Sequence, residues 1–295
     1  MAQNAIDRTI QSQGWLDQLA DPMQRFVRNV LKPGPTGTPL RNILHGTFLG
    51  HPLHPTLTDI PIGGWTAALV FDLLSYLPFV GRAFAPGADA AITLGLIGAA
   101  PTAASGYADW SHANGHVRRV GLVHALSNAT SVLLYTSSLV MRARGNRSLG
   151  RGVSFLGYGV VSFGAYLGGE LVYRYGLGTA PTAFERPSSD EWADVGEESS
   201  LGRGEMRRVE VDGEPVLLAR DDSGRISAMS NTCTHMGCSL AEGKLDGTTV
   251  TCPCHGSQFD VATGLAVRGP ASVPESRYEV DILAGRIKLQ PTQPK

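Results

Sequence analysis

Two short runs in the C-terminal part of the chain contain the residue types that bind metals. The first run reads CTHMGC and begins at Cys233, and the second reads CPCHGS and begins at Cys252. Each run pairs its first cysteine with a nearby histidine, His235 in the first and His255 in the second. Two thiolates and two imidazoles can bind a zinc ion, or a [2Fe–2S] cluster that has sulfur ligands on one iron and nitrogen ligands on the other. These four residues are therefore the predicted metal ligands.

Two further cysteines help to distinguish the two kinds of metal centre. The same runs hold Cys238 and Cys254, and these complete the 4 cysteines of a chain of 295 residues. A zinc site needs four ligands and would leave this second pair without a role. The six positions taken together favour an iron–sulfur cluster over zinc.

The paired runs resemble the signature of Rieske proteins. This resemblance implies a [2Fe–2S] cluster in which Cys233 and Cys252 ligate one iron, and His235 and His255 ligate the other. An imidazole on the outer iron can lose its remaining proton in the oxidised state, so electron uptake can be coupled to proton uptake. Such coupling suits a quinol as the electron donor.

The resemblance also assigns roles to residues around the ligands. Cys238 and Cys254 match the cysteines that form a disulfide in the Rieske proteins of quinol-oxidising cytochrome complexes. Ser257 matches the serine whose hydroxyl donates to a cluster sulfide. Gly269 and Pro270 lie in a stretch that resembles the proline-containing loop covering the cluster.

One position departs from the pattern of high-potential Rieske proteins. Those proteins usually carry a tyrosine two residues after the serine, whereas this chain has Phe259. Without a hydroxyl donor, negative charge added to the cluster is less stabilised. We therefore expect an intermediate reduction potential.

The composition divides the chain into two unlike halves. The net charge of the whole chain is −1, which argues against nucleic acid as a partner. Residues 1–184 hold 13 basic and 8 acidic residues, a balance of +5, and residues 185–295 hold 12 and 18, a balance of −6. The first half is apolar and basic, and the second is polar and acidic.

Four apolar segments follow a polar N-terminal region. They lie at about 57–80, 88–109, 120–141 and 153–175, and each is close to the ~20 residues that a membrane-spanning helix requires. They are rich in Gly, Ala and Ser, which let membrane helices approach closely. A soluble bundle would need charged outer faces that these segments lack. We expect four transmembrane helices in a bacterial cell membrane.

The motifs in this half also resemble a known family. HPLHPTLTDIPIG, YADW and GGELVYRYG are similar to stretches of a bacterial four-helix membrane family of uncharacterised function. Members of that family are sometimes fused ahead of a Rieske domain. The resemblance supports the topology and implies no mechanism.

Several polar residues lie in or next to the apolar segments. Asp72, His124 and Glu170 fall within them, and His51 and His54 precede the first. Ionisable groups in a membrane are costly and are often functional. These residues could form a quinone pocket or hold a haem between two histidines. Alternatively, they hydrogen-bond one helix to another or lie at the level of the lipid headgroups.

The expected fold class is a two-domain one, a four-helix transmembrane bundle followed by a small all-β Rieske domain. Residues 1–40 form a polar segment with an amphipathic stretch that either lies on the membrane surface or packs on its own protein. Residues 41–178 form the membrane domain, and residues 192–290 form the Rieske domain. Short strands with turn pairs such as Asp212-Gly213 indicate β-hairpins in this second domain.

The stretch 179–205 is expected to be a solvated linker, because it is rich in Gly, Pro, Ser and acidic residues. A flexible linker would let an electron-carrying head move between its donor and its acceptor. The basic residues near the helix ends number six on the N-terminal side and five on the other, which only leans towards a cytoplasmic Rieske domain. The expected disulfide favours an oxidising compartment instead.

The sequence thus predicts a membrane-anchored electron carrier and not a self-contained enzyme. Its expected partners are redox proteins of the membrane or of the soluble phase, and a quinone as a further candidate. The main hypothesis is transfer of single electrons from a membrane donor such as quinol to a protein acceptor. The alternatives are a supplier of electrons to an oxygenase or reductase, and a redox sensor or structural subunit.

Overall fold

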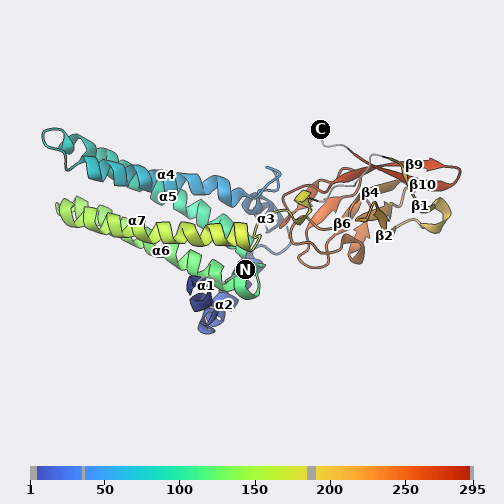
Figure 1. Ribbon diagram of the computed structural model, residues 1–295, viewed down its shortest axis with the longest axis horizontal. Coiled ribbons are helices and arrows are strands. Elements are labelled where there is room, and N and C mark those ends of the chain that lie inside the picture. Colours follow the sequence, from blue (N-terminus) through green and yellow to red (C-terminus); the bar gives the residue numbers. More distant parts are fainter. Residues whose placement is uncertain (1–4, 35–36, 185–190, 293–295) are drawn as a thin grey trace. The chain divides into compact units, whose positions relative to one another are not determined.

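The computed structural model describes residues 5–34, 37–184 and 191–292 (Figure 1). Contacts divide the chain into two compact units, each assembled from two stretches of sequence. The helical unit comprises Met1–Leu31 and Leu53–Leu177, and the β unit comprises Lys32–Pro52 and Gly178–Lys295. The two units alternate along the chain, because the short stretch Lys32–Pro52 belongs to the β unit and lies between the two parts of the helical unit.

Four long helices form the body of the helical unit. They are α4 (Leu53–Leu74), α5 (Ala85–Trp110), α6 (Gly115–Ala143) and α7 (Arg147–Gly169). The 3-10 turn η1 (Gly81–Phe84) precedes α5, and the π-helical turn η2 (Glu170–Arg174) continues α7. Helix α4 packs mainly on α5, and α6 packs mainly on α7. Each of the four apolar segments of the sequence lies largely within one of these helices.

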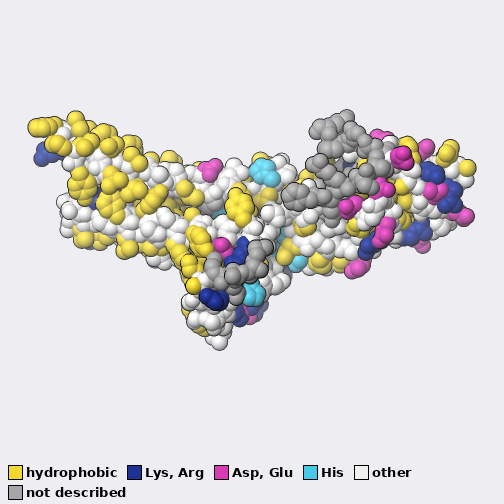
Figure 2. Space-filling model, in the orientation of Figure 1, with side chains coloured by type: hydrophobic (Ala, Val, Ile, Leu, Met, Phe, Trp, Pro, Cys, Tyr) yellow, Lys and Arg dark blue, Asp and Glu magenta, His cyan; other side chains and the backbone are white. Residues whose placement is uncertain are grey.

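Three of the described helical stretches are long and apolar enough to cross a membrane: Leu53–Leu74, Gly81–Trp110 and Arg147–Arg174. Helix α6 has 29 residues but lies outside this group, because serine, threonine, asparagine and histidine side chains lower its hydropathy. Hydrophobic side chains cover the outward face of α4 and α5 in Figure 2. Such a surface suits contact with lipid.

Small residues bring the long helices close together. The indole of Trp65 in α4 stacks on the ring of Tyr135 in α6, with 4.5 Å between the ring centroids. A Cβ atom at Gly95 in α5 would collide with the same indole. Glycine at this position is therefore required for the observed packing of α4 on α5.

The amphipathic N-terminal stretch packs on its own protein. Helices α1 (Ala5–Gln11) and α2 (Trp15–Val30) both contact α6. Leu16 and Ala20 are buried, whereas Phe26 on another face of α2 is 69% exposed. Of the two alternatives, packing on the protein is the one observed, and an apolar face of α2 stays exposed.

Ion pairs hold α2 against the start of α6. The carboxylate of Asp17 lies 2.7 Å from the guanidinium of Arg118 and 2.6 Å from that of Arg119. The hydrogen bond from Arg119 is the largest cause that lowers the pKa of Asp17 to about 2. Because the pKa is lower than in an unfolded chain, this carboxylate stabilises the fold above about pH 4 and ceases to do so as the pH falls towards 2.

The β unit contains two antiparallel sheets. The larger has the strand order β1-β10-β9-β4-β3-β2, and the smaller has the order β5-β6-β7-β8. The strands of the larger sheet are β1 (Ala193–Glu197), β2 (Glu205–Val211), β3 (Glu214–Arg220), β4 (Ile226–Ser230), β9 (Arg277–Leu283) and β10 (Arg286–Pro291). The strands of the smaller are β5 (Lys244–Asp246), β6 (Thr249–Thr251), β7 (Gln258–Asp260) and β8 (Ala266–Arg268). In the register of β2 and β3, Val211 faces Glu214 across the predicted Asp212-Gly213 turn.

Part of the expected linker belongs to the larger sheet. Within 179–205, β1 pairs antiparallel with β10, and the 3-10 turns η3 (Pro181–Phe184) and η4 (Glu198–Ser200) flank it. The acidic composition was misleading, because Asp194 lies 2.6 Å from Arg286 and 2.8 Å from Lys288 of β10. The negative charge is therefore paired across the sheet. Residues 185–190 of the expected linker lie outside the described residues.

Helix α3 (Gly37–His45) belongs to the β unit. This differs from the expectation that residue 41 begins the membrane domain. The helix packs on β8, although the sequence places it ahead of all the long helices. Its contacts reach the loops that carry the predicted ligands.

Candidate metal centre

Two loops of the β unit carry the four predicted ligands. The first loop follows β4, and the second connects β6 to β7. Both have the same backbone hydrogen bonds. The amide of Cys233 donates to the carbonyl of Cys238 at 2.9 Å, and the amide of Cys252 donates to that of Ser257 at 2.8 Å. The two short runs of sequence thus fold into two similar turns.

A glycine closes each turn. The amide of Gly237 donates to the carbonyl of Cys233 at 2.8 Å, and the amide of Gly256 donates to that of Cys252 at 3.1 Å. Both glycines have positive φ, 78° and 72°. Residues with a Cβ atom rarely adopt this conformation, so the glycines are needed for the cysteine of each loop to turn inward.

The two loops bring like side chains together. Cys233 and Cys252 are free thiols with 1% and 2% exposure, and their sulfur atoms are hydrogen-bonded. The rings of His235 and His255 meet edge to face, with 4.9 Å between centroids. Both rings are only partly buried. The arrangement places two sulfur donors inside the domain and two nitrogen donors nearer its surface.

Two of these side chains, Cys252 and His255, have pKa shifts in the direction that favours metal binding. The hydrogen bond from Cys233 lowers the pKa of the Cys252 thiol to about 6, and the same bond together with burial raises the pKa of Cys233. Burial lowers the pKa of His255, and the charge of Arg41 adds to this shift. A thiolate and a neutral imidazole are the forms that bind metals. The donor set therefore suits a [2Fe–2S] cluster.

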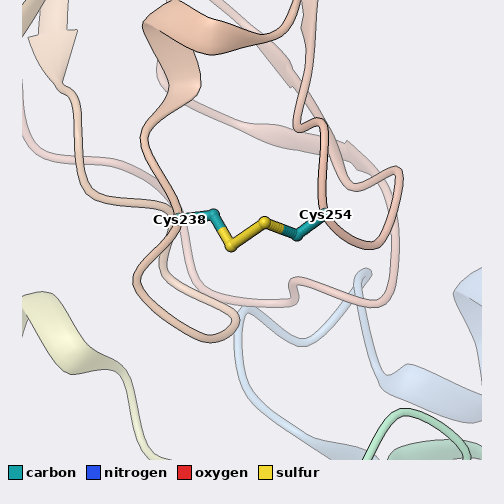
Figure 3. The surroundings of a disulfide bond; sticks show 2 residues. All are labelled: Cys238 and Cys254. Atoms are coloured by element: carbon teal, nitrogen blue, oxygen red, sulfur yellow. A yellow bond between two sulfur atoms is a disulfide. The ribbon is translucent and has the colours of Figure 1, made fainter.

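The predicted disulfide between Cys238 and Cys254 is present and joins the two ligand loops (Figure 3). The sulfur atoms of Cys238, Cys252 and Cys254 lie within 4.8 Å of one another. Two of these three form the disulfide and cannot act as thiolate ligands. Within this group of three, only Cys252 has a free thiol. The other free thiol of the β unit is that of Cys233, which lies outside the group.

Ser257 and the third loop lie beside the two ligand loops. The buried hydroxyl oxygen of Ser257 accepts a hydrogen bond of 3.0 Å from the amide of Ala271, which follows Gly269 and Pro270. Because the oxygen accepts this bond, the hydroxyl hydrogen is available for donation to another group. This is compatible with the role that the resemblance implies for Ser257. Phe259 is fully buried, in the same core cluster as the two free cysteines.

Sequence reasoning missed one residue that links the third loop to the first. The carboxylate of Glu275 is buried and accepts a hydrogen bond of 2.8 Å from the amide of Thr234, which lies between Cys233 and His235. The hydroxyl of Thr234 donates to the carbonyl of Val273 at 2.7 Å. No motif marks these residues, since they meet only through the fold.

Sequence reasoning also missed α3. Arg41 donates to the carbonyl of His255 at 2.8 Å. Arg268 donates to the carbonyl of Gly256 at 2.7 Å. Burial, followed by the charge of Arg268, lowers the pKa of Arg41 to about 10, so the guanidinium stays charged at neutral pH. Two cations thus approach the second ligand loop.

The five polar residues proposed for a membrane redox site do not form one cluster. His54 and His124 meet in the helical unit, with 6.4 Å between ring centroids. Asp72 binds the guanidinium of Arg142 at 2.8 Å. His51 lies in the other unit, where its Nδ1 is 3.0 Å from the carbonyl of Pro52.

His54, His124 and Glu170 each have polar partners within the helical unit. Nδ1 of His54 lies 2.9 Å from the carbonyl oxygen of Thr102, and Nδ1 of His124 lies 2.8 Å from that of Gly164. Glu170 pairs with Arg174 at 2.9 Å. Helix-to-helix hydrogen bonding, one of the two alternatives, therefore describes both histidines.

Comparison with known proteins assigns a family to each half of the chain. Residues 191–284 match the family model described as "Rieske [2Fe-2S] domain". Residues 50–181 match the model described as "Predicted membrane protein (DUF2231)". Together these matches confirm the predicted succession of a membrane domain and a Rieske domain.

Several ferredoxins are similar to the C-terminal part of the chain. Ferredoxin CarAc of Metapseudomonas resinovorans is 36% identical over 96 residues, 32% of this chain and 90% of the relative. The ferredoxin component of the naphthalene 1,2-dioxygenase system of Pseudomonas aeruginosa is 31% identical over 101 residues, 34% of this chain and 96% of the relative. The solved ferredoxin of carbazole 1,9a-dioxygenase from Nocardioides aromaticivorans IC177 is 29% identical, with a TM-score of 0.33, and the match covers 34% of this chain and 98% of that one.

Proposed function

Because this chain belongs to the Rieske [2Fe–2S] family through residues 191–284, we propose that the protein carries single electrons between a membrane donor and a protein acceptor. The observation that carries the proposal is the pairing of two buried thiols with two partly buried imidazoles on adjacent loops. A cluster held by such a set accepts and releases one electron at a time. We assign Cys233, His235, Cys252 and His255 as its ligands.

The partly exposed histidines supply the path for the electron. His235 and His255 lie nearer the surface than the buried thiols, and Met236 beside His235 is 42% exposed. An apolar side chain next to an accessible ring suits a brief contact with another protein. The relative from Pseudomonas aeruginosa is the ferredoxin component of a dioxygenase system, which supports an oxygenase component as the acceptor.

The topology of the chain supports an even number of membrane crossings. Helix α3 precedes the first long helix, the strands follow the last, and both belong to the β unit. The two ends of the helical stretch therefore emerge on the same side of the membrane. Three helical stretches meet the criteria for a span, so α6 must be the fourth crossing despite its polar side chains. Some of these side chains, such as Ser131 and Ser138, are buried, and the exposed Thr130 and Thr136 donate to carbonyls of their own helix.

A quinol is the membrane donor that we propose. His54 and His124 are the two members of the expected redox site that come together, and their Nδ1 atoms are both engaged by backbone carbonyls. This fixes the Nε2 atoms as hydrogen-bond acceptors, and that of His124 already accepts from Nδ2 of Asn128 at 3.1 Å, so we propose His54 as the acceptor for quinol. An acceptor nitrogen within a membrane domain can receive a hydroxyl proton from quinol.

The test compares two donors with the full-length protein in detergent. We expect a short-chain quinol to reduce the protein, followed by the EPR signal of the reduced cluster. His54→Ala and His124→Ala should slow this reaction about tenfold or more while the iron content stays unchanged. Reduction by a soluble ferredoxin reductase alone, with no response to quinol, would disprove the membrane donor. Zinc in place of iron would disprove electron transfer altogether.

The Phe259→Tyr variant should have a higher reduction potential than the native protein. Phe259 lies in the same buried cluster as Cys233 and Cys252, so an added hydroxyl would be close to the ligands. A hydroxyl donor stabilises the negative charge gained on reduction. A potentiometric titration followed by EPR measures the difference, and Phe259→Leu serves as the control without a hydroxyl. Equal potentials in the two variants would contradict the assigned cause.

A further inference from the structure

Helix α3, Gly37–His45, forms a strap on the loops that carry the ligands. It precedes all the long helices, yet it contacts residues that follow it by more than 200 positions. The side chain of Asn42 lies between Val267 and Gly269. Its Nδ2 donates to the carbonyl of Val267 at 3.1 Å, and its Oδ1 accepts from the amide of Gly269 at 3.0 Å. The Asn42 side chain thus hydrogen-bonds both the carbonyl of Val267 and the amide of Gly269, as the backbone of a neighbouring β-strand would.

The strap sits close to the third loop because Gly269 has no side chain. A Cβ atom at this position would lie 3.2 Å from Cδ2 of His45, and His45 is itself buried. The contact is tighter than usual for a Cβ atom, so a larger residue would require His45 to shift by a few tenths of an ångström. Glycine here therefore permits the close approach of α3 to the third loop.

Arg41 places a positive charge at the second ligand loop. Its exposure is 6%, and it donates to the carbonyl of the predicted ligand His255 at 2.8 Å. Among the residues that the structure describes, no carboxylate forms an ion pair with Arg41. Arg268 donates to the next carbonyl, that of Gly256, at 2.7 Å. Two guanidinium groups therefore donate to adjacent carbonyls of this loop.

A buried charge of this kind influences a redox centre more strongly than a surface charge does. Solvent and salt screen exposed charges, whereas a buried charge keeps most of its effect over several ångströms. Reduction adds one negative charge at the ligand loops. A nearby cation stabilises the reduced form relative to the oxidised form, which raises the reduction potential.

We propose that Arg41 is a positioning residue that holds the His255 loop and raises the reduction potential of the centre. The strap, a segment that precedes the membrane helices, would thereby set the electron affinity of a domain at the other end of the chain. The proposal rests on the proposed electron-carrier function. The proposal can be tested separately from that function, because the reduction potential can be measured without knowing the electron donor or acceptor.

The experiment measures the midpoint potential of the full-length native protein and of four variants. Arg41→Gln removes the charge, and Arg41→Lys keeps it. Asn42→Ala releases the strap, and the control Arg208→Gln removes a charge of the same β unit from an exposed position on β2. We expect the potential to fall in Arg41→Gln, to fall less in Arg41→Lys, and to stay unchanged in Arg208→Gln.

Iron content and the EPR spectrum of the reduced state show whether each variant retains its cluster. An unchanged potential in Arg41→Gln would overturn the proposal, and so would an equal fall in Arg41→Lys and Arg41→Gln. If Arg41→Gln retains no iron, Asn42→Ala decides, because release of the strap should lower its potential in the same direction. An unchanged potential in that variant would then overturn the proposal. Absence of iron from the native protein would instead refute the proposed function.

Discussion

Replacing Cys252 with alanine should yield a protein that contains almost no iron or acid-labile sulfide. This thiol is buried and lies beside the second free thiol, that of Cys233, so the two sulfur donors of the assigned ligand set are adjacent. Removing one of four ligands leaves an iron atom with an open position and a damaged cluster. Iron and sulfide analysis, with the optical spectrum of the purified protein, measures the loss. The effect should be nearly complete.

The matched control is the double variant Cys238→Ala/Cys254→Ala, which removes the disulfide and no predicted ligand. It should retain iron, and its thermal stability should fall. The disulfide spans 16 positions of sequence, and a crosslink of this span contributes about 3 kcal/mol in a simple entropic estimate. Iron retained in Cys252→Ala but lost from the double variant would show that the ligands are wrongly assigned.

Replacing Asp72 with alanine should strongly destabilise the helical unit. Asp72 and Arg142 have side-chain exposures of 1% each, and their closest oxygen and nitrogen atoms are 2.5 Å apart. Without its partner, the guanidinium of Arg142 stays buried among four helices with a weaker second partner, Asp89, at 3.1 Å. Breaking a buried ion pair from one side costs about 3–5 kcal/mol. A thermal melt in detergent, followed by circular dichroism, measures the loss.

Two further variants separate the loss of the ion pair from other effects. Asp89→Ala removes a carboxylate that is 34% exposed, so its cost should be clearly smaller. The double variant Asp72→Leu/Arg142→Met removes both charges and should recover much of the lost stability. A melting temperature of Asp72→Ala equal to that of the native protein would contradict the structural role. If Asp72→Ala were stable but no longer reacted with quinol, the result would instead support a role for Asp72 in a membrane redox site.

The features that the structure confirms depend on short stretches of sequence. The cysteines and histidines two or three positions apart lie on two adjacent loops, and a turn pair such as Asp212-Gly213 defines its hairpin locally. Long apolar runs likewise indicate membrane helices without knowledge of their neighbours. The family resemblance then added the disulfide of Cys238 and Cys254, which the spacing alone does not specify.

The features that were missed depend on partners far away in the sequence. Asp72 looked functional because an isolated acid in an apolar helix is costly, but its partner Arg142 lies 70 positions later. The acidic stretch around Asp194 resembled a solvated linker because its basic partners lie more than 90 positions away, on β10. Arg41 carries no pattern at all, since its acceptor is a backbone carbonyl 214 positions later. Such pairings follow from the tertiary fold alone.

The contact between the strap and the second ligand loop has a consequence for the order in which the protein is made. Arg41 leaves the ribosome 214 positions before His255, which at typical rates of synthesis corresponds to about 10–40 s. During that interval the long helices emerge and the acceptor for the Arg41 side chain does not yet exist. The strap therefore cannot dock until the β strands have been synthesised and folded. Docking of the strap is a late step in biogenesis, and a fragment that starts at residue 191 would omit it entirely.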